Sequence, residues 1–60
     1  MNSNLPQDPI MLMSFINMKL RDEYSSLDSL CKSLDIDKEE LELTLRKSGF
    51  EYNQEENKFW

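Results

Sequence analysis

The chain contains no histidine, and its 60 residues include one cysteine, Cys31, and one glycine, Gly49. Nucleophilic catalysis usually needs a base such as histidine beside the nucleophile, and phosphate-binding cradles are built from glycine-rich loops. The sequence therefore predicts a protein that is not an enzyme. A single cysteine forms no internal disulfide, which fits a reducing compartment. We interpret Cys31 as a small buried hydrophobe because it lies in an apolar stripe.

Long apolar runs are also missing. No stretch approaches the roughly 20 apolar residues that cross a bilayer, and the first residues lack the basic segment of a secretory signal. We therefore expect a cytoplasmic protein with no membrane partner. A chain of 60 residues makes one domain. A domain of this size buries only about 60% of the surface that its unfolded chain exposes, so its stability is expected to be marginal.

Basic residues are few: seven Lys and Arg stand against 12 Asp and Glu, which gives a net charge of −5. Such a charge repels nucleic-acid phosphates and anionic lipid. Acidic side chains gather from Asp35 to Glu40, but the spacing is not that of a calcium loop. That loop needs glycine at its sixth position and glutamate at its twelfth, where a count from Asp35 gives Glu40 and Arg46. We interpret Asp35 as a turn residue and Asp37 as a helix cap.

Paired carboxylates in the same stretch could in principle serve acid/base catalysis. Such a pair needs a concave site that separates the two pKa values. A chain of 60 residues leaves little room for one. We therefore expect no metal, no cofactor and no small-molecule substrate.

The N-terminal segment, residues 1–7, has no periodicity and is expected to form a flexible arm, which leaves residues 8–60 as a single domain. Asp8 can accept hydrogen bonds from the first helical amides, and Pro9 suits the first helical position, so the first helix is predicted to begin there. At about 100° per residue, one stripe of this helix faces the core. Its members are Leu12, Ile16 and Leu20, flanked by Ile10, Met13 and Tyr24.

A second apolar stripe lies on nearly the opposite side of the same helix, at Met11, Phe15 and Met18. In so small a protein, this stripe is either covered by the C-terminal segment with Trp60 or offered to another molecule. Met and Phe are adaptable contact residues, so a dimer or partner surface remains open as the second interpretation.

The stretch from Ser26 to Gly49 has the spacing of two short helices joined by a tight turn, the helix-turn-helix pattern. Ser25 or Ser26 is predicted to cap the first of these helices. Asp35 stands where many such turns have glycine, and Asp tolerates a left-handed backbone better than most residues. Asp37 is predicted to cap the next helix and Gly49 to end it. The expected core residues of this unit are Leu27, Leu30, Cys31, Leu34, Ile36, Leu41 and Leu45.

Residues 50–60 place apolar side chains on both sides of the polar run NQEEN, which predicts a β-hairpin. Two strands alone are marginal in water, so Phe50, Tyr52 and Phe59 are expected to lay one face of a wing-like appendage on the helices. The predicted fold class is mainly α, with a three-helix, helix-turn-helix-like core and a C-terminal β-hairpin, similar to a winged helix.

Four segments of the chain resemble a known family: LPQDP, LDSLC, LDIDKEEL and GFEYNQEENKF. It is the small bacterial family catalogued as domain of unknown function 4250, and the likeness spans residues 5–59. The resemblance implies a stand-alone bacterial protein. It carries over no activity, cofactor, partner or site residue.

In a DNA-binding protein of this pattern, the third helix would be the reader. From Asp37 to Lys47, however, the chain has three basic and four acidic residues. Residues 50–60 have one basic and three acidic residues. DNA affinity comes chiefly from Lys and Arg that displace counterions, so this charge disfavours nucleic acid as a partner. The alternative of a helix-turn-helix DNA-binding or transcription-associated protein stays open through the topology and through a cluster that could form from Lys19, Arg21, Arg46 and Lys47.

By elimination, and from the second stripe, we interpret the chain as a noncatalytic protein-interaction module whose partner is a second copy or another protein. The candidate contact surface consists of Met11, Phe15, Met18, Leu43 and Trp60. Leu43 belongs to this set because it is apolar yet points away from Leu41 and Leu45. A solitary exposed leucine is its simpler interpretation, and a flap over the hairpin is the simpler one for Trp60.

Overall fold

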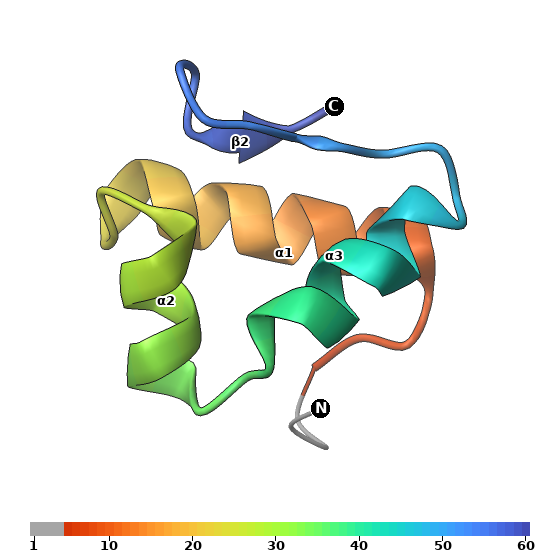
Figure 1. The fold of residues 1–60 in the computed structure, drawn as a ribbon, viewed down its shortest axis with the longest axis horizontal. Coiled ribbons are helices and arrows are strands. Elements are labelled where there is room, and N and C mark those ends of the chain that lie inside the picture. Colours follow the sequence, from red (N-terminus) through yellow and green to blue (C-terminus); the bar gives the residue numbers. More distant parts are fainter. Residues whose placement is uncertain (1–4) are drawn as a thin grey trace.

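The computed structural model describes residues 5–60, which form three helices followed by a two-stranded antiparallel hairpin (Figure 1). The elements in chain order are α1 (Pro9–Asp22), α2 (Leu27–Leu34), α3 (Lys38–Arg46), β1 (Tyr52–Asn53) and β2 (Lys58–Phe59). The predicted fold class is confirmed. The first residues of the predicted arm lie outside the described residues, and Leu5 packs against the core.

The start of α1 is fixed by Asp8, as predicted. One carboxylate oxygen of Asp8 accepts hydrogen bonds from the N–H groups of Ile10 at 2.8 Å and Met11 at 3.2 Å. Pro9, at the first helical position, has no N–H to satisfy. These contacts pair amides that an uncapped first turn would leave without a partner.

The helix-turn-helix unit is defined by three short polar residues. Ser26 caps α2 by accepting a hydrogen bond from the N–H of Ser29 at 3.2 Å. Asp35 ends α2 in the left-handed region, with φ 56° and ψ 50°, which confirms the conformation predicted for this turn. Asp37 then caps α3 through the N–H of Glu40 at 3.2 Å.

Gly49 turns the chain back after α3. Its φ is +92°, and its N–H donates to the carbonyl oxygen of Arg46 at 2.9 Å, while the N–H of Phe50 donates to Leu45 at 2.9 Å. This pair of bonds is a Schellman motif, which pairs carbonyl groups that the last helical turn leaves free. The motif directs Phe50 against the core and starts the hairpin.

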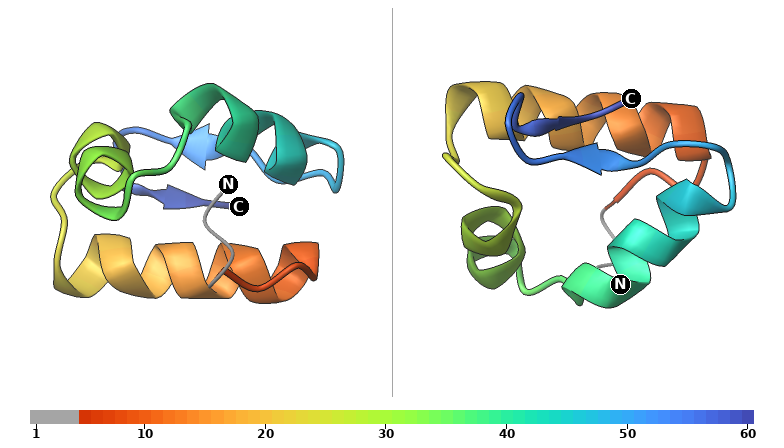
Figure 2. Two further views of the ribbon diagram at one scale, coloured as in Figure 1. Left: turned by 90° about the horizontal axis from the view of Figure 1, so that it is seen from below. Right: turned by 45° about the horizontal axis from the view of Figure 1, so that its top comes forward.

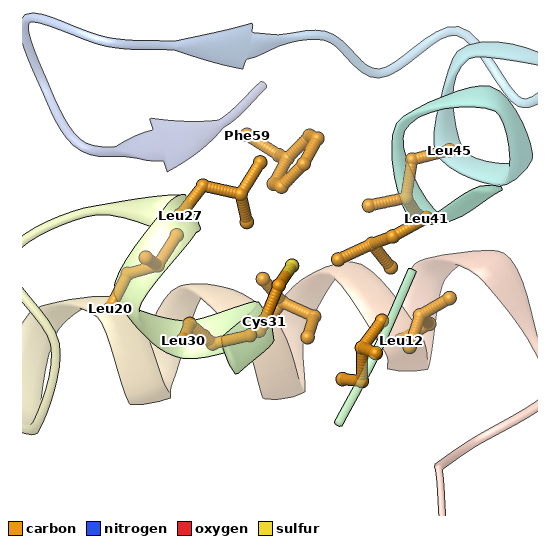
Figure 3. Close-up of a cluster of buried hydrophobic side chains, with 10 residues drawn as sticks. Leu12, Leu20, Leu27, Leu30, Cys31, Leu41, Leu45 and Phe59 are labelled. Carbon is orange, nitrogen blue, oxygen red and sulfur yellow. The ribbon is translucent and has the colours of Figure 1, made fainter. Parts of the chain in front are cut away.

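A single apolar core lies between α1 and the other elements (Figure 3). Figure 2 shows α1 along one side of the domain and α3 on the opposite side, and α1 contacts α2, α3 and β2. The predicted core residues are confirmed, except that Leu34 is only half-buried and that Ile10, expected beside the inward stripe of α1, is exposed. The buried residues are Leu12, Ile16, Leu20, Leu27, Leu30, Cys31, Ile36, Leu41, Leu45 and Phe59.

The hairpin contributes to this core directly. Tyr52 pairs with Phe59, and Asn53 with Lys58. The rings of Tyr52 and Phe59 lie on the inner face with their centroids 5.3 Å apart, and Phe59 is 2% exposed. The hairpin is therefore an integral part of the core rather than a loosely attached wing.

Candidate interaction surfaces

The outward side of α1 carries the stripe predicted as a contact surface. Met11 and Met18 are 62% and 44% exposed, so the interpretation that the C-terminal segment covers this stripe is wrong for these two residues. Phe15 differs, because it is half-buried and packs against the core. The Lys19 ammonium lies 5.7 Å from the Phe15 ring centroid. In this stripe the two methionines are thus exposed to solvent, whereas Phe15 packs against the core.

Ile10 was expected beside the inward stripe, and this prediction is wrong, because Ile10 is 62% exposed. Six positions separate Ile10 from Ile16. At about 100° per residue this separation leaves their side chains roughly 120° apart around the helix. Ile10 is therefore a further exposed apolar side chain next to Met11.

Trp60 is 58% exposed and does not form a flap over the inner face of the hairpin. Side chains alternate along a strand. Because Phe59 points into the core, Lys58 and Trp60 both point outward, and the Lys58 ammonium lies 5.1 Å from the Trp60 ring centroid. Trp60 therefore presents an aromatic surface to solvent.

The hairpin is fastened to the middle of α1 by Asn17. The Asn17 carboxamide donates to the carbonyl oxygen of Phe59 at 2.9 Å and accepts from the Phe59 N–H at 2.7 Å. One side chain thus satisfies both backbone groups of a strand residue, as a neighbouring strand would.

Asn57, which has a φ of 54° in the hairpin turn, makes a second set of hydrogen bonds between the hairpin and α1. Its side-chain amide donates to the carbonyl oxygens of Leu20 at 3.2 Å and Tyr24 at 3.1 Å. Its side-chain oxygen accepts from the Tyr52 hydroxyl at 2.6 Å. Asn57 therefore caps the C-terminal end of α1 from a distant part of the sequence.

The two asparagine contacts make β2 run antiparallel to α1, because Asn57 lies at the end of α1 and Phe59 lies near its middle. Trp60 follows, toward the half of α1 that carries Ile10 and Met11. We call the exposed apolar residues of α1 and of the adjoining strand end the α1–Trp60 face: Ile10, Met11, Met18 and Trp60.

An open groove lies beside this face, between α1 and the hairpin turn. The helix lines it with residues that include Ser14, Met18 and Arg21, and the hairpin with Glu56, Asn57 and Lys58. The groove gives the α1–Trp60 face a hollow bordered by both apolar and charged side chains.

Leu43 is 50% exposed but does not belong to the α1–Trp60 face. Leu41 and Leu45 are buried in the core, so Leu43, two positions from each, points away from the core. Because α1 and α3 lie on opposite sides of the domain, their outward faces point in different directions (Figure 2). The structure therefore does not bring Leu43 together with Met11, Met18 and Trp60.

The basic residues considered for DNA contact are distributed rather than clustered. Lys19 and Arg21 lie in the last turn of α1 and Arg46 in the last turn of α3, and Figure 1 shows these two helix ends at opposite ends of the domain. Lys19 pairs with Glu23 at 2.6 Å and Arg21 with Asp22 at 2.9 Å. These acidic neighbours offset part of the charge that phosphate would need.

Cys31 is 5% exposed, which confirms that it packs as a small buried hydrophobe. Burial raises the pKa of its thiol. The thiol therefore stays protonated at neutral pH, and a thiol is a far weaker nucleophile than a thiolate. Within residues 5–60, no three His, Cys, Asp or Glu side chains are grouped closely enough to hold a metal ion.

A family model described as domain of unknown function (DUF4250) matches residues 6–59. No curated protein and no solved structure matches the chain significantly. Across residues 5–60, no helix has the length and apolar character that crossing a membrane requires.

Proposed function

The chain belongs to this DUF4250 family, whose description names no activity, and we propose that it is a noncatalytic protein-interaction module that binds through the α1–Trp60 face. The observation that carries the proposal is the exposure of four large apolar side chains, three on α1 and one at the end of the hairpin strand that lies along this helix. Singly exposed apolar residues are ordinary, but several on adjoining elements of a small protein are typical of a contact surface.

The composition of the face also supports binding. Trp, Met and Arg are enriched in protein interfaces, and Trp and Arg often carry much of the binding energy. Trp60 and Met18 are exposed, and Arg21 borders the adjacent groove. Methionine side chains are flexible, which suits a surface that adapts to a partner.

The proposal that the protein is not an enzyme is supported by the absence of histidine and by the protonated state of Cys31. The chain therefore offers no histidine base to activate a nucleophile, and its cysteine is not a thiolate. The cytoplasmic location and the identity of the partner, whether a second copy or another protein, remain predictions.

The proposed function is tested with two surface variants of matched chemistry. Met11→Glu combined with Met18→Glu places charge on the α1–Trp60 face, and Leu43→Glu places charge on an equally exposed position of α3. Each bait is used for capture from cells that express the chain naturally, the retained protein is purified, and its affinity for each bait is measured. Self-association is followed in parallel by sedimentation at several concentrations.

We expect the double variant to lose at least tenfold in affinity while its unfolding midpoint stays within a few degrees of wild type. Leu43→Glu should bind as wild type does. If Leu43→Glu abolishes binding and the double variant does not, the contact surface lies on α3 and the assignment to the α1–Trp60 face is wrong.

DNA binding is supported only by the helix-turn-helix order of α2 and α3. The acidic α3 and the dispersed cations oppose it. A gel-shift assay against mixed duplexes at low salt tests this alternative. Salt-sensitive binding that is lost when Arg46 and Lys47 are changed to Ala would favour DNA binding over protein interaction as the function.

A further inference from the structure

The two edges of the hairpin differ in how their backbone groups are satisfied. Glu51 and Trp60 exchange both backbone hydrogen bonds, each 3.0 Å long. Hydrogen-bonded and non-hydrogen-bonded pairs alternate along an antiparallel ladder. The next pair, Tyr52 and Phe59, is therefore of the non-hydrogen-bonded kind, and both residues direct their N–H and C=O groups outward from the sheet.

On the β2 edge these groups are occupied. The Asn17 carboxamide takes both the N–H and the carbonyl oxygen of Phe59. Figure 2 shows β2 next to α1 and β1 farther from that helix. The β2 edge is thus closed by α1 and offers no site for another strand.

On the β1 edge the corresponding groups of Tyr52 have no hydrogen-bond partner among residues 5–60. The side chain of Tyr52 is nonetheless fixed, because its hydroxyl donates to Asn57 and its ring packs on Phe59. The backbone of β1 is therefore held in place and, within residues 5–60, keeps one free donor and one free acceptor at its edge. Free strand edges are templates for pairing with another chain.

A groove runs beside this edge, between β1, the start of α2 and the side of α3. It is lined in part by Tyr52 and Gln54 from the hairpin, by Asp28 from α2, and by Lys38 and Glu42 from α3. The Lys38 ammonium lies 2.8 Å from the Asp28 carboxylate. Among the described residues Glu42 has no ion pair of its own, although its charge also acts on Lys38, so these three side chains leave the groove with a net charge of −1.

We propose that the β1 edge binds an extended, basic peptide segment of a partner protein, which adds a third strand to the hairpin by pairing with the backbone of Tyr52 and places a Lys or Arg beside Glu42. This site is separate from the α1–Trp60 face and does not depend on it. Strand addition is an established mode of peptide recognition, in which backbone bonds give affinity and side-chain contacts give specificity.

Charge selects the occupant. The whole chain carries a net charge of −5, so a basic segment is attracted both over a distance and by Glu42 in the groove. A second copy of the chain would bring the same net charge and an acidic groove of its own. A helical partner would have no free backbone groups to offer Tyr52, because a helix satisfies them internally.

The test uses the full chain, labelled with ¹⁵N, and three synthetic hexapeptides with blocked ends. The first alternates lysine and valine, the second alternates glutamate and valine, and the third has the lysine–valine sequence with its backbone N–H groups methylated. The third peptide keeps the charge of the first but cannot donate backbone hydrogen bonds. Amide shifts and the hydrogen exchange of the Tyr52 N–H are measured in each titration.

We expect the lysine–valine peptide to shift the amides of Tyr52 and Gln54 and, at saturation, to slow exchange of the Tyr52 N–H at least tenfold. The glutamate–valine and methylated peptides should bind at least tenfold more weakly. Glu42→Lys should weaken the lysine–valine peptide about tenfold, whereas Glu39→Lys, an equal charge change on the same helix, should weaken it less than threefold. Met11→Glu with Met18→Glu should leave this binding unchanged. The proposal for the β1 edge can therefore be refuted without refuting the one for the α1–Trp60 face, and the reverse also holds.

Equal binding by the methylated peptide would show attraction by charge alone and would overturn the proposal. Protection of the Tyr52 N–H that rises with protein concentration in the absence of peptide would also overturn it, because the occupant would then be a second copy.

Discussion

The helix-turn-helix unit and the hairpin are held by contacts of very different range. Ser26 and Asp37 cap α2 and α3 through amides three positions away, and Asp35 turns the chain by its own backbone conformation. The hairpin is instead joined to α1 by Asn17 and Asn57, whose partners lie 33 to 42 positions away. The helices of this domain are thus specified locally, whereas the placement of the hairpin depends on a few polar contacts between distant residues.

The largest effect is expected where the two regions share one core, at Phe59. Phe59→Ala removes one of the largest fully buried side chains and should cost about 3–5 kcal/mol, as is usual for buried Phe. In so small a domain this loss leaves little or no folded protein at 25 °C. Urea unfolding followed by circular dichroism measures the change.

The control is Trp60→Ala, in the same segment but 58% exposed, which should change the unfolding free energy far less. Equal stability of the two variants would mean that the hairpin is an appendage after all. Phe59→Leu, a smaller reduction, keeps the comparison measurable if Phe59→Ala does not fold.

The next effect concerns the long-range contacts themselves. Asn17→Ala leaves the N–H and C=O of Phe59 without their partners, in a partly buried position. Leaving such groups unpaired costs about 1–3 kcal/mol. Exchange of the Phe59 amide should also become faster than that of amides in α3. Denaturant titration and hydrogen exchange measure the two quantities, and Ser14→Ala, one turn earlier and exposed, serves as the control with little change in either.

Retention of slow Phe59 exchange in Asn17→Ala would contradict this account of the β2 edge. It would mean that core packing alone holds the hairpin against α1.

The local contacts should give a smaller effect. Asp37→Ala removes the acceptor for the Glu40 N–H and should cost about 1 kcal/mol, the usual value of an N-cap. Asp37→Asn keeps an acceptor at the same position and should cost only a fraction of that. Thermal unfolding of the two variants side by side distinguishes capping from a general effect of the charge. A loss as large in Asp37→Asn as in Asp37→Ala would contradict the capping role.

The difference in contact range explains which features could be predicted from the sequence. Caps, the left-handed Asp35, the inward stripe of α1 and the hairpin follow from residues close to each other in the chain, and all are present. The roles of Asn17 and Asn57 could not be predicted, because an asparagine that bonds to a distant backbone has the same local pattern as one that faces solvent. The free edge of β1 was missed for the same reason, since it is defined by what Asn17 does on the other strand.

The candidate contact surface was predicted in part. Met11, Met18 and Trp60 are exposed, whereas Phe15 packs against the core and Leu43 lies on the far side of the domain. Ile10 was assigned to the wrong side of α1. Helical periodicity gives the direction of a side chain relative to its own helix, but which other helix stands on that side depends on tertiary packing. Surfaces built from several elements therefore need the coordinates.

The smallest effect is expected at the ion pair that Asp28 of α2 forms with Lys38 of α3. The hydrogen bond from Lys38 lowers the pKa of the Asp28 carboxyl below its ordinary value of 3.8. A carboxyl whose pKa is lower in the folded state stabilises the fold above its unfolded pKa, and that contribution is lost as the pH falls through the folded value. The stabilisation is therefore present at pH 7 and is progressively lost as the pH falls below about 3.8.

Asp28→Asn should accordingly be less stable than wild type at pH 7, and the difference should shrink as the pH is lowered below 3.8, in paired denaturant titrations. Both side chains are exposed, so about 1 M salt should remove most of the difference at pH 7. Asp35→Asn, which removes a carboxylate outside the pair and keeps a residue that tolerates the left-handed backbone, should not reproduce this pH dependence. If Asp35→Asn shows the same pH dependence, the effect arises from the total charge of the chain. The packing of α2 against α3 would then be stabilised by the caps and the core, without a contribution from the ion pair.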